Sequence, residues 1–123
     1  MTRLLLAAFA VLWAGLSAPV PAQVPGQQLY VVTHVDLAGA AAAPEGTRLL
    51  RQFVMESRKD PGAVRIELLV EPTRLNHLTL VEVWQTRANF DAHLAAPHTK
   101  VFRDKLQPLL GSPFDERLHV ILP

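Results

Sequence analysis

The sequence contains no cysteine. Thiol catalysis, iron–sulfur clusters and zinc ribbons are therefore excluded, and packing alone must stabilise the fold because no disulfide can form. The six glycines are dispersed, so the chain has neither a glycine-rich phosphate loop nor a Gly-x-Ser-x-Gly nucleophile elbow. Basic residues form no run, and without Arg3 there are 11 Lys and Arg against 11 Asp and Glu. The sequence therefore gives no reason to expect nucleic-acid binding.

Long apolar runs are also scarce, and the longest covers thirteen residues, from Leu4 to Leu16. This run is shorter than the roughly 20 residues that a helix needs to cross a bilayer. It follows Arg3 and precedes small residues that end at Ala22, which is typical of a cleaved secretory leader and not of a membrane anchor. We expect a signal peptide at residues 1–22, a flexible lead-in at 23–28 and one domain at 29–123. The mature protein is then periplasmic or secreted, with no membrane attachment after cleavage.

Hydrophobic periodicity predicts the element order β-α-β-β-α-β across this domain. Strands are expected at residues 29–36, 63–71, 77–85 and about 117–122, and helices at 44–59 and 87–110. Pro97 divides the second helix into two pieces, and a loop longer than two residues, 72–76, joins the central strands. This order is typical of the α+β class and predicts a ferredoxin-like plait, an antiparallel four-stranded sheet with its helices on one face.

Both faces of the predicted sheet carry apolar side chains. One face is expected to carry Tyr30, Val32, Leu80 and Trp84. The opposite face is expected to carry Leu29, Val31, Val35, Val81 and Val83. Because the helices cover only one face, the other needs a second apolar surface, and another copy of the chain is the simplest source. We therefore expect a homodimer joined through its sheets.

Four residues from Glu82 to His98 are candidates for chemistry. Glu82 and Trp84 lie two apart on a strand and share a face, where a carboxylate among apolar neighbours needs a partner or a raised pKa. His93 and His98 flank Pro97, where the break leaves a gap for an imidazole, the side chain best suited to proton transfer near neutral pH. Each residue also has an ordinary interpretation. Glu82 can form a structural ion pair, Trp84 can belong to the core, and each histidine can lie at a helix end.

A metal site is the less favoured interpretation of these residues. It requires His34, His93, His98 and Glu82 to converge. Two helical histidines five residues apart across a proline do not have the His-x-x-x-His spacing that places both nitrogens on one ion. We therefore expect no bound metal.

Several short motifs occur in a recognisable order. They are Ser57-Arg58-Lys59-Asp60-Pro61-Gly62 at the end of the first helix, Glu82-Val83-Trp84 in the third strand, and His93 followed by His98 and Phe102. In this order the chain resembles the antibiotic biosynthesis monooxygenase family, particularly its small quinol-monooxygenase-like members, from about residue 29 to 120. The resemblance implies a dimeric α/β barrel with a pocket between sheet and helices in each subunit. It also implies oxygenation of phenols, anthrones or quinols by molecular oxygen without metal, flavin or another cofactor.

The resemblance further implies roles for individual residues. His93 or His98 is the base that removes a phenolic proton, and Glu82 orients an imidazole or a substrate hydroxyl. The predicted pocket is lined by Trp84, Tyr30, Phe90, Phe102, His34 and Leu80.

Two departures from the family pattern limit this transfer. Leu80 stands where the anthrone-oxidising members have an Asn, and the stretch around Phe102 lacks the haem-ligating His of haem-degrading relatives. We expect an exported monooxygenase that oxidises a small aromatic quinol or phenol with molecular oxygen. The alternative is a dimeric protein that binds an apolar small molecule without turnover.

Overall fold

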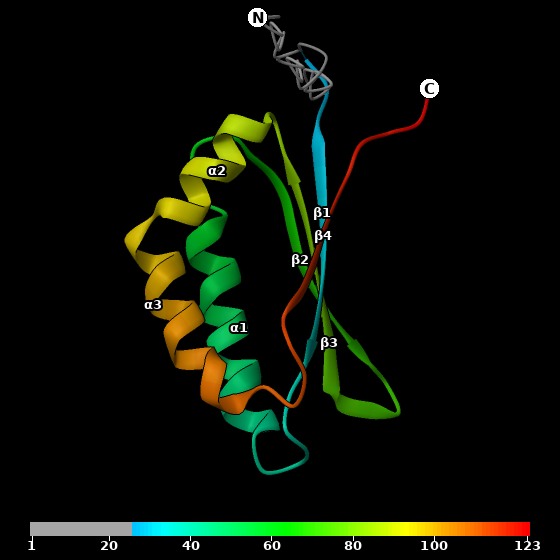
Figure 1. Cartoon of the computed structure of the whole chain (residues 1–123), viewed down its shortest axis with the longest axis vertical. Helices are drawn as coiled ribbons and strands as arrows, with labels where there is room; N and C mark the ends of the chain where they lie inside the picture. The colour runs from blue at the N-terminus through cyan, green and yellow to red at the C-terminus, as the bar shows by residue number, and fades with distance from the viewer. Residues whose placement is uncertain (1–25) are drawn as a thin grey trace, which may run out of the picture.

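A computed structural model describes residues 26–123, in which a four-stranded antiparallel sheet carries its helices on one face (Figure 1). The elements are β1 (Leu29–Asp36), α1 (Ala43–Ser57), β2 (Ala63–Glu71), β3 (Arg74–Trp84), α2 (Arg87–Ala95), α3 (Pro97–Leu106), a 3-10 turn (Gln107–Leu109) and β4 (Asp115–His119). The strands are ordered β2-β3-β1-β4. This confirms the predicted α+β, ferredoxin-like fold. The predicted leader at 1–22 and residues 23–25 of the lead-in lie outside the described residues.

Local sequence explains where the helices begin and end. Thr86 is extended and its hydroxyl accepts a hydrogen bond from the backbone N–H of Asn89 at 3.1 Å, which caps the start of α2. Ala96 is also extended, because the ring of Pro97 disfavours the helical conformation in the residue before it. The second helix therefore breaks into α2 and α3 at Pro97, as predicted. Among helices of the described residues, none has the length and apolarity needed to cross a membrane.

Several boundaries differ from the prediction, and three of the differences change an element or a loop. Only Pro72 and Thr73 connect β2 to β3, so the longer loop predicted at 72–76 is wrong. Residues of that stretch instead join β3, and a register irregularity between Val70 and Glu71 accommodates them. The helix predicted to reach residue 110 ends at Leu106 and tightens into a 3-10 turn. β4 ends at His119, the last of its residues that pairs with β1.

The register between β1 and β3 corrects the predicted assignment of side chains to faces. Leu29 lies opposite Trp84, and Val31 lies opposite Glu82. Directly opposed residues point to the same face of a sheet, so β1 contributes Leu29 and Val31 to the helix-covered face. The prediction that placed Tyr30 with Trp84 is wrong. Alternation fixes the faces within one strand, whereas the relation between two strands depends on their register.

The helix-covered face contains the hydrophobic core. Its buried members include Val31, Val35, Leu50, Phe53, Ile66, Leu78, Leu80, Trp84, Phe90, Phe102 and Leu106. The outer face carries a second, smaller apolar group that is opposed across β1 and β3 and formed by Tyr30, Val32, Val81 and Val83. Three of these four remain partly exposed. The expectation that both faces are apolar is therefore confirmed, although the residues on each face are partly exchanged.

Candidate functional site

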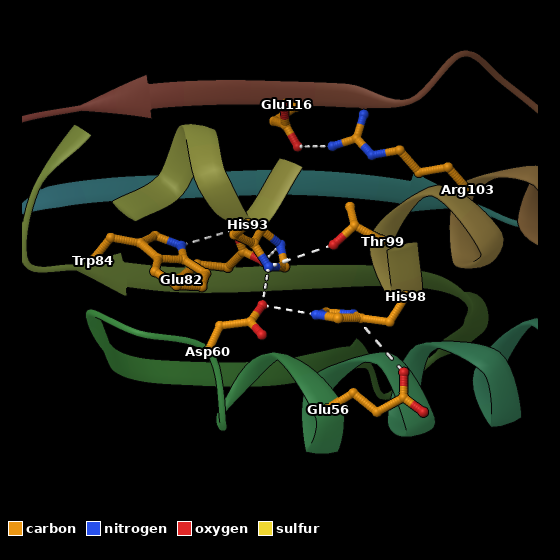
Figure 2. Close-up of polar contacts among 9 residues, drawn as sticks. All are labelled: Glu56, Asp60, Glu82, Trp84, His93, His98, Thr99, Arg103 and Glu116. Atoms are coloured by element: carbon orange, nitrogen blue, oxygen red, sulfur yellow. Dashed lines mark hydrogen bonds and ion pairs between the residues drawn. The ribbon is translucent and has the colours of Figure 1, made fainter. Parts of the chain in front are cut away.

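The polar centre of the molecule is a single oxygen of Asp60 (Figure 2). His93 Nδ1 lies 2.7 Å and His98 Nε2 lies 2.8 Å from the same atom, Asp60 Oδ2. Asp60 follows α1, His93 lies in the last turn of α2, and His98 lies in the first turn of α3. The break before Pro97 therefore brings two imidazoles from consecutive helices to one carboxylate.

His93 is the buried member of this pair, with 1% of its side chain exposed. Its ring centroid lies 4.6 Å from that of Trp84 and 5.4 Å from that of Phe53. Burial lowers the pKa of His93, although the hydrogen bond to Asp60 acts in the opposite direction. The neutral imidazole donates Nδ1–H to Asp60, and its Nε2 lies 3.9 Å from Glu82 Oε1. His93 thus connects two carboxyl groups inside the protein.

Glu82 is buried on the helix-covered face, with 2% of the residue exposed. The indole Nε1–H of Trp84 donates to Glu82 Oε2 at 3.3 Å. Burial raises the pKa of Glu82 to about 7, with the Trp84 hydrogen bond and the charge of Arg103 opposing the rise and the charge of Glu116 adding to it. Arg103 itself is held by Glu116, at 2.6 Å, so it does not pair with Glu82 directly.

His98 is the accessible member of the pair, with 23% of its side chain exposed. Its Nε2–H donates to Asp60. Its Nδ1 is buried, has no hydrogen-bond partner among residues 26–123 and lies 3.8 Å from Glu56 Oε2. His98 lines a cleft of about 240 Å³ between α1 and α3. The other lining residues are Leu49, Gln52, Phe53, Glu56, Pro97, Val101, Phe102 and Lys105.

The structure places the predicted site residues in four different surroundings. His98 and Phe102 line the cleft, and His93 and Glu82 lie buried behind it. Trp84, Phe90 and Leu80 are at most 2% exposed and pack in the core.

Tyr30 and His34 lie on the outer face of the sheet, opposite Val83 and Thr79. The prediction that these two residues share a pocket with Trp84 is therefore wrong. His34 contacts the hydroxyl of Thr79, with Nδ1 and Oγ1 3.3 Å apart.

Asp60 is the functional candidate that sequence reasoning missed. Its neighbours Pro61 and Gly62 indicate only the end of a helix. Gly62 has a φ of +81°, and a Cβ atom at this position would lie 2.2 Å from Cγ of Asn89. The turn therefore packs against the start of α2, which places Asp60 beside His93. The sequence shows only a carboxylate that follows a helix. Its partners, His93 and His98, are 33 and 38 residues away, so local pattern does not reveal the contact.

A larger hollow on the described surface lies elsewhere. It has a volume of about 740 Å³ and lies between α1 and the β2–β3 hairpin. Its lining includes Arg48, Arg51 and Met55 but no histidine. The two histidines that contact Asp60 therefore lie away from this hollow, and His98 lines the smaller cleft.

Comparison with known proteins gives a family match. The family model described as antibiotic biosynthesis monooxygenase matches residues 31–105. Among curated proteins, the uncharacterized protein sll1783 of Synechocystis sp. is 30% identical over 73 residues, which cover 59% of this chain and 50% of the relative. The chain thus spans about half the length of this curated relative.

Solved structures share the fold. PA3566 from Pseudomonas aeruginosa has a TM-score of 0.74 at 20% identity, covering 82% of this chain and 100% of that one. SnoaB, described as a cofactor-independent oxygenase from Streptomyces nogalater, has a TM-score of 0.68 at 22% identity, covering 76% and 92%. At these identities the likeness establishes the fold alone.

Proposed function

The chain belongs to the antibiotic biosynthesis monooxygenase family, and we propose that it oxidises a single-ring quinol or phenol with molecular oxygen and without a cofactor. The observation that carries this proposal is the pairing of His98 with Asp60 at the wall of a cleft. The similarity to SnoaB, a cofactor-independent oxygenase, supports the reaction class.

The His98–Asp60 pair has the arrangement of an oriented general base. Asp60 accepts the Nε2–H of His98, which fixes the tautomer and leaves a lone pair on Nδ1. Within the described residues Nδ1 has no hydrogen-bond partner, but the atom is buried and lies 3.8 Å from Glu56 Oε2. A substrate hydroxyl therefore reaches this lone pair when the side chains of His98 and Glu56 move apart at the cleft wall. An oriented imidazole of this kind is the base in many hydrolases that use a carboxylate–histidine pair.

The cleft suits a small aromatic ring. Phe53 and Phe102 stack at its wall with ring centroids 4.0 Å apart. Its volume of about 240 Å³ is below the range of roughly 300–1,000 Å³ that is usual for ligand pockets. A single-ring substrate therefore fits the cleft better than a fused anthrone.

The proposed reaction needs no external reductant, because the substrate supplies every electron. His98 takes the hydroxyl proton, and the electron-rich phenolate passes one electron to oxygen. The resulting ring radical and superoxide combine at a ring carbon that bears hydrogen, and His98 returns the proton to the peroxide. Loss of the ring proton with cleavage of the O–O bond gives a carbonyl and water. A phenol and oxygen thus yield a quinone and water, and a quinol yields a hydroxyquinone and water.

His93 and Glu82 are buried next to the His98–Asp60 pair and help to position it. His93 donates the second hydrogen bond to Asp60 Oδ2, which helps to hold the carboxylate in place for His98. Glu82 lies next to His93 and Trp84 and is buried, away from the cleft. We assign both residues to positioning and not to contact with substrate.

We also propose that the protein is exported and acts as a homodimer. Residues 1–22 have the pattern of a cleaved leader, and the apolar outer face of the sheet favours pairing with a second copy. Light scattering at micromolar concentration should give the mass of two chains, and the mass of one chain would contradict the dimer.

Oxygen uptake tests the proposed reaction. Chelator-treated full-length protein is assayed with a panel of single-ring quinols and phenols, beside Asp60→Asn and the control His34→Ala. We expect uptake faster than autoxidation in the parent and the control, and a loss of most of the catalysed rate in Asp60→Asn because the tautomer of His98 is no longer fixed. Uptake equal to autoxidation in the parent would contradict the proposal.

Binding without turnover is the second candidate. It is favoured by the mainly apolar lining of the cleft, which includes Leu49, Phe53 and Phe102. This function predicts saturable binding of the same aromatic compounds with no oxygen uptake, so the two measurements together separate the candidates.

A further inference from the structure

Asp60, His93 and His98 also have the composition of a metal-binding site. Two imidazoles and one carboxylate suit Zn²⁺ and other divalent first-row metals. One ligand atom from each of the three residues can be chosen so that all lie within 4.8 Å of one another. We propose that these three residues bind one divalent first-row transition metal ion, with Zn²⁺ as the probe. This inference goes beyond the proposed oxidation and does not depend on it.

The observed distances require only a small adjustment. Zn²⁺ binds imidazole nitrogen at about 2.0–2.1 Å and carboxylate oxygen at about 2.0–2.2 Å, so tetrahedral ligand atoms lie roughly 3.4 Å apart. Asp60 Oδ2 now lies 2.7 Å from His93 Nδ1 and 2.8 Å from His98 Nε2. An ion therefore requires the Asp60 oxygen to move back from both nitrogens by about 1 Å, and the three ligand atoms, now within 4.8 Å of one another, to take up the tetrahedral spacing.

Each histidine has a carboxylate on its far side. His93 Nε2 lies 3.9 Å from Glu82, and His98 Nδ1 lies 3.8 Å from Glu56. Metal-bound histidines almost always donate their other ring N–H to such an acceptor. Metal binding would displace the protons that now face Asp60, so the outer nitrogens would carry them. His98 Nδ1, which lacks a hydrogen-bond partner in the described part of the chain, would then donate to Glu56 once the two side chains close the present 3.8 Å separation.

The site combines a fixed ligand with accessible ones. His93 is buried and held between aromatic rings, whereas the side chains of Asp60 and His98 are 18% and 23% exposed. His98 also lines the neighbouring cleft, from which an ion would approach the site. Three protein ligands with one open position are typical of zinc sites that exchange ligands.

The helix break resolves the objection from spacing. On a continuous helix, His-x-x-x-His is required because only residues one turn apart share a face. Here His93 ends α2 and His98 begins α3, so the change of direction before Pro97 replaces the missing periodicity. The third ligand comes from the turn after α1.

A bound metal and the His98–Asp60 base are alternative states of the same atoms. The ion would occupy Nε2 of His98 and leave the proton on Nδ1, where the base needs its lone pair. Metal binding is therefore expected to inhibit the proposed oxidation. If the oxidation does not occur, metal binding remains measurable by itself.

Calorimetric titration of untagged, metal-free full-length protein with Zn²⁺ tests the site. We expect one ion per chain. Loss of a residue that supports a metal ligand usually weakens metal binding by roughly 10- to 100-fold. We therefore expect Kd for Zn²⁺ to rise by roughly 10-fold in Glu56→Gln. In His98→Ala, which removes a ligand itself, we expect Kd to rise by more than this range. His34→Ala, on the outer face of the sheet, should bind as the parent does.

A second measurement separates loss of a ligand from loss of the fold. Circular dichroism should show that His98→Ala is folded, and the absorption of bound Co²⁺ should report a coordination number that changes between the parent and His98→Ala. Absence of Zn²⁺ binding in the folded parent would overturn the proposal. Unchanged affinity in folded His98→Ala, or equal weakening in His34→Ala, would overturn it as well.

Discussion

The two halves of the broken helix, α2 and α3, bring one histidine each to the same oxygen of Asp60, yet the environments of these histidines differ. The side chain of His93 on α2 is 1% exposed, and that of His98 on α3 is 23% exposed. One imidazole is packed between Trp84 and Phe53, and the other borders a cleft. A single break in a helix thus gives two identical side chains different environments, one packed among aromatic rings and one at the wall of a cleft.

The largest expected difference between the halves is in stability. His93→Ala removes a buried ring that contacts Trp84 and Phe53 and should lower the free energy of unfolding by about 3–5 kcal/mol, as for other buried rings. His98→Ala removes one partly exposed hydrogen bond and should cost about 1 kcal/mol. Urea unfolding measures both values. Equal losses would show that the two histidines are equivalent.

The pH dependence of stability tests the burial of Glu82 beside His93. The folded pKa of Glu82 is about 7, above its ordinary value of 4.5, so the folded protein binds the proton more tightly than the unfolded chain. The contribution of Glu82 to stability should therefore be fully present below about pH 4.5 and should fall by about 3 kcal/mol in total as the pH rises through about 7. The charged or titratable groups around Glu82 are His93 from α2, Arg103 from α3 and Glu116 from β4.

The variant Glu82→Gln cannot ionise at this position, so it should not lose this stability as the pH rises. Urea unfolding of metal-free protein between pH 5 and 8 compares the two chains, with Glu67→Gln on the exposed strand β2 as the control. The lowered pKa of His93 has the opposite sign and costs stability only as the pH falls below about 6.5. If the free energy of unfolding changes with pH in the same way in the parent and in Glu82→Gln, then burial does not raise the pKa of Glu82.

The turn that carries Asp60 can be tested with two glycines. Gly62 and Gly39 have φ values of +81° and +79°, so alanine at either position should cost about 1–2 kcal/mol in backbone strain. A Cβ at Gly62 also collides with Asn89, whereas a Cβ at Gly39 meets nothing within 4 Å. Thermal unfolding should show the larger loss for Gly62→Ala. Equal losses would mean that the turn does not rest on α2.

The smallest effects concern the starts of the two helices. Thr86 caps α2 with its side chain, whereas Ala96 starts α3 in an extended conformation with no side-chain cap. Thr86→Ala should lower the free energy of unfolding by about 1 kcal/mol, and Ala96→Ser should raise it by up to about 1 kcal/mol. Chemical denaturation of both variants checks this, and a loss in Ala96→Ser would contradict it.

The sequence predicted the parts of this molecule that depend on local pattern. The element order follows from hydrophobic periodicity, and the break at Pro97 follows from the missing N–H of proline. The cap at Thr86 follows from a hydroxyl placed just before a helix. It also selected His93, His98 and Glu82, which the fold brings together. Only their positions were tested by the structure, and their catalytic roles stay predictions.

The errors concern relations between distant segments. Tyr30 was assigned to the wrong face because the register of two strands is set by tertiary pairing and not by alternation within one strand. Asp60 was overlooked because its partners come from two other helices. The predicted loop at 72–76 was wrong because an irregularity at Val70 and Glu71 let β3 begin earlier.

If His98, held by Asp60, is the base for oxidation in the cleft, then the kcat/KM for quinol-dependent oxygen uptake depends on its imidazole. We predict that His98→Ala lowers this value by about 10²- to 10⁴-fold, the usual contribution of a general base, while His34→Ala leaves it unchanged. A folded His98→Ala chain with the kcat/KM of the parent would show that His98 is not the base.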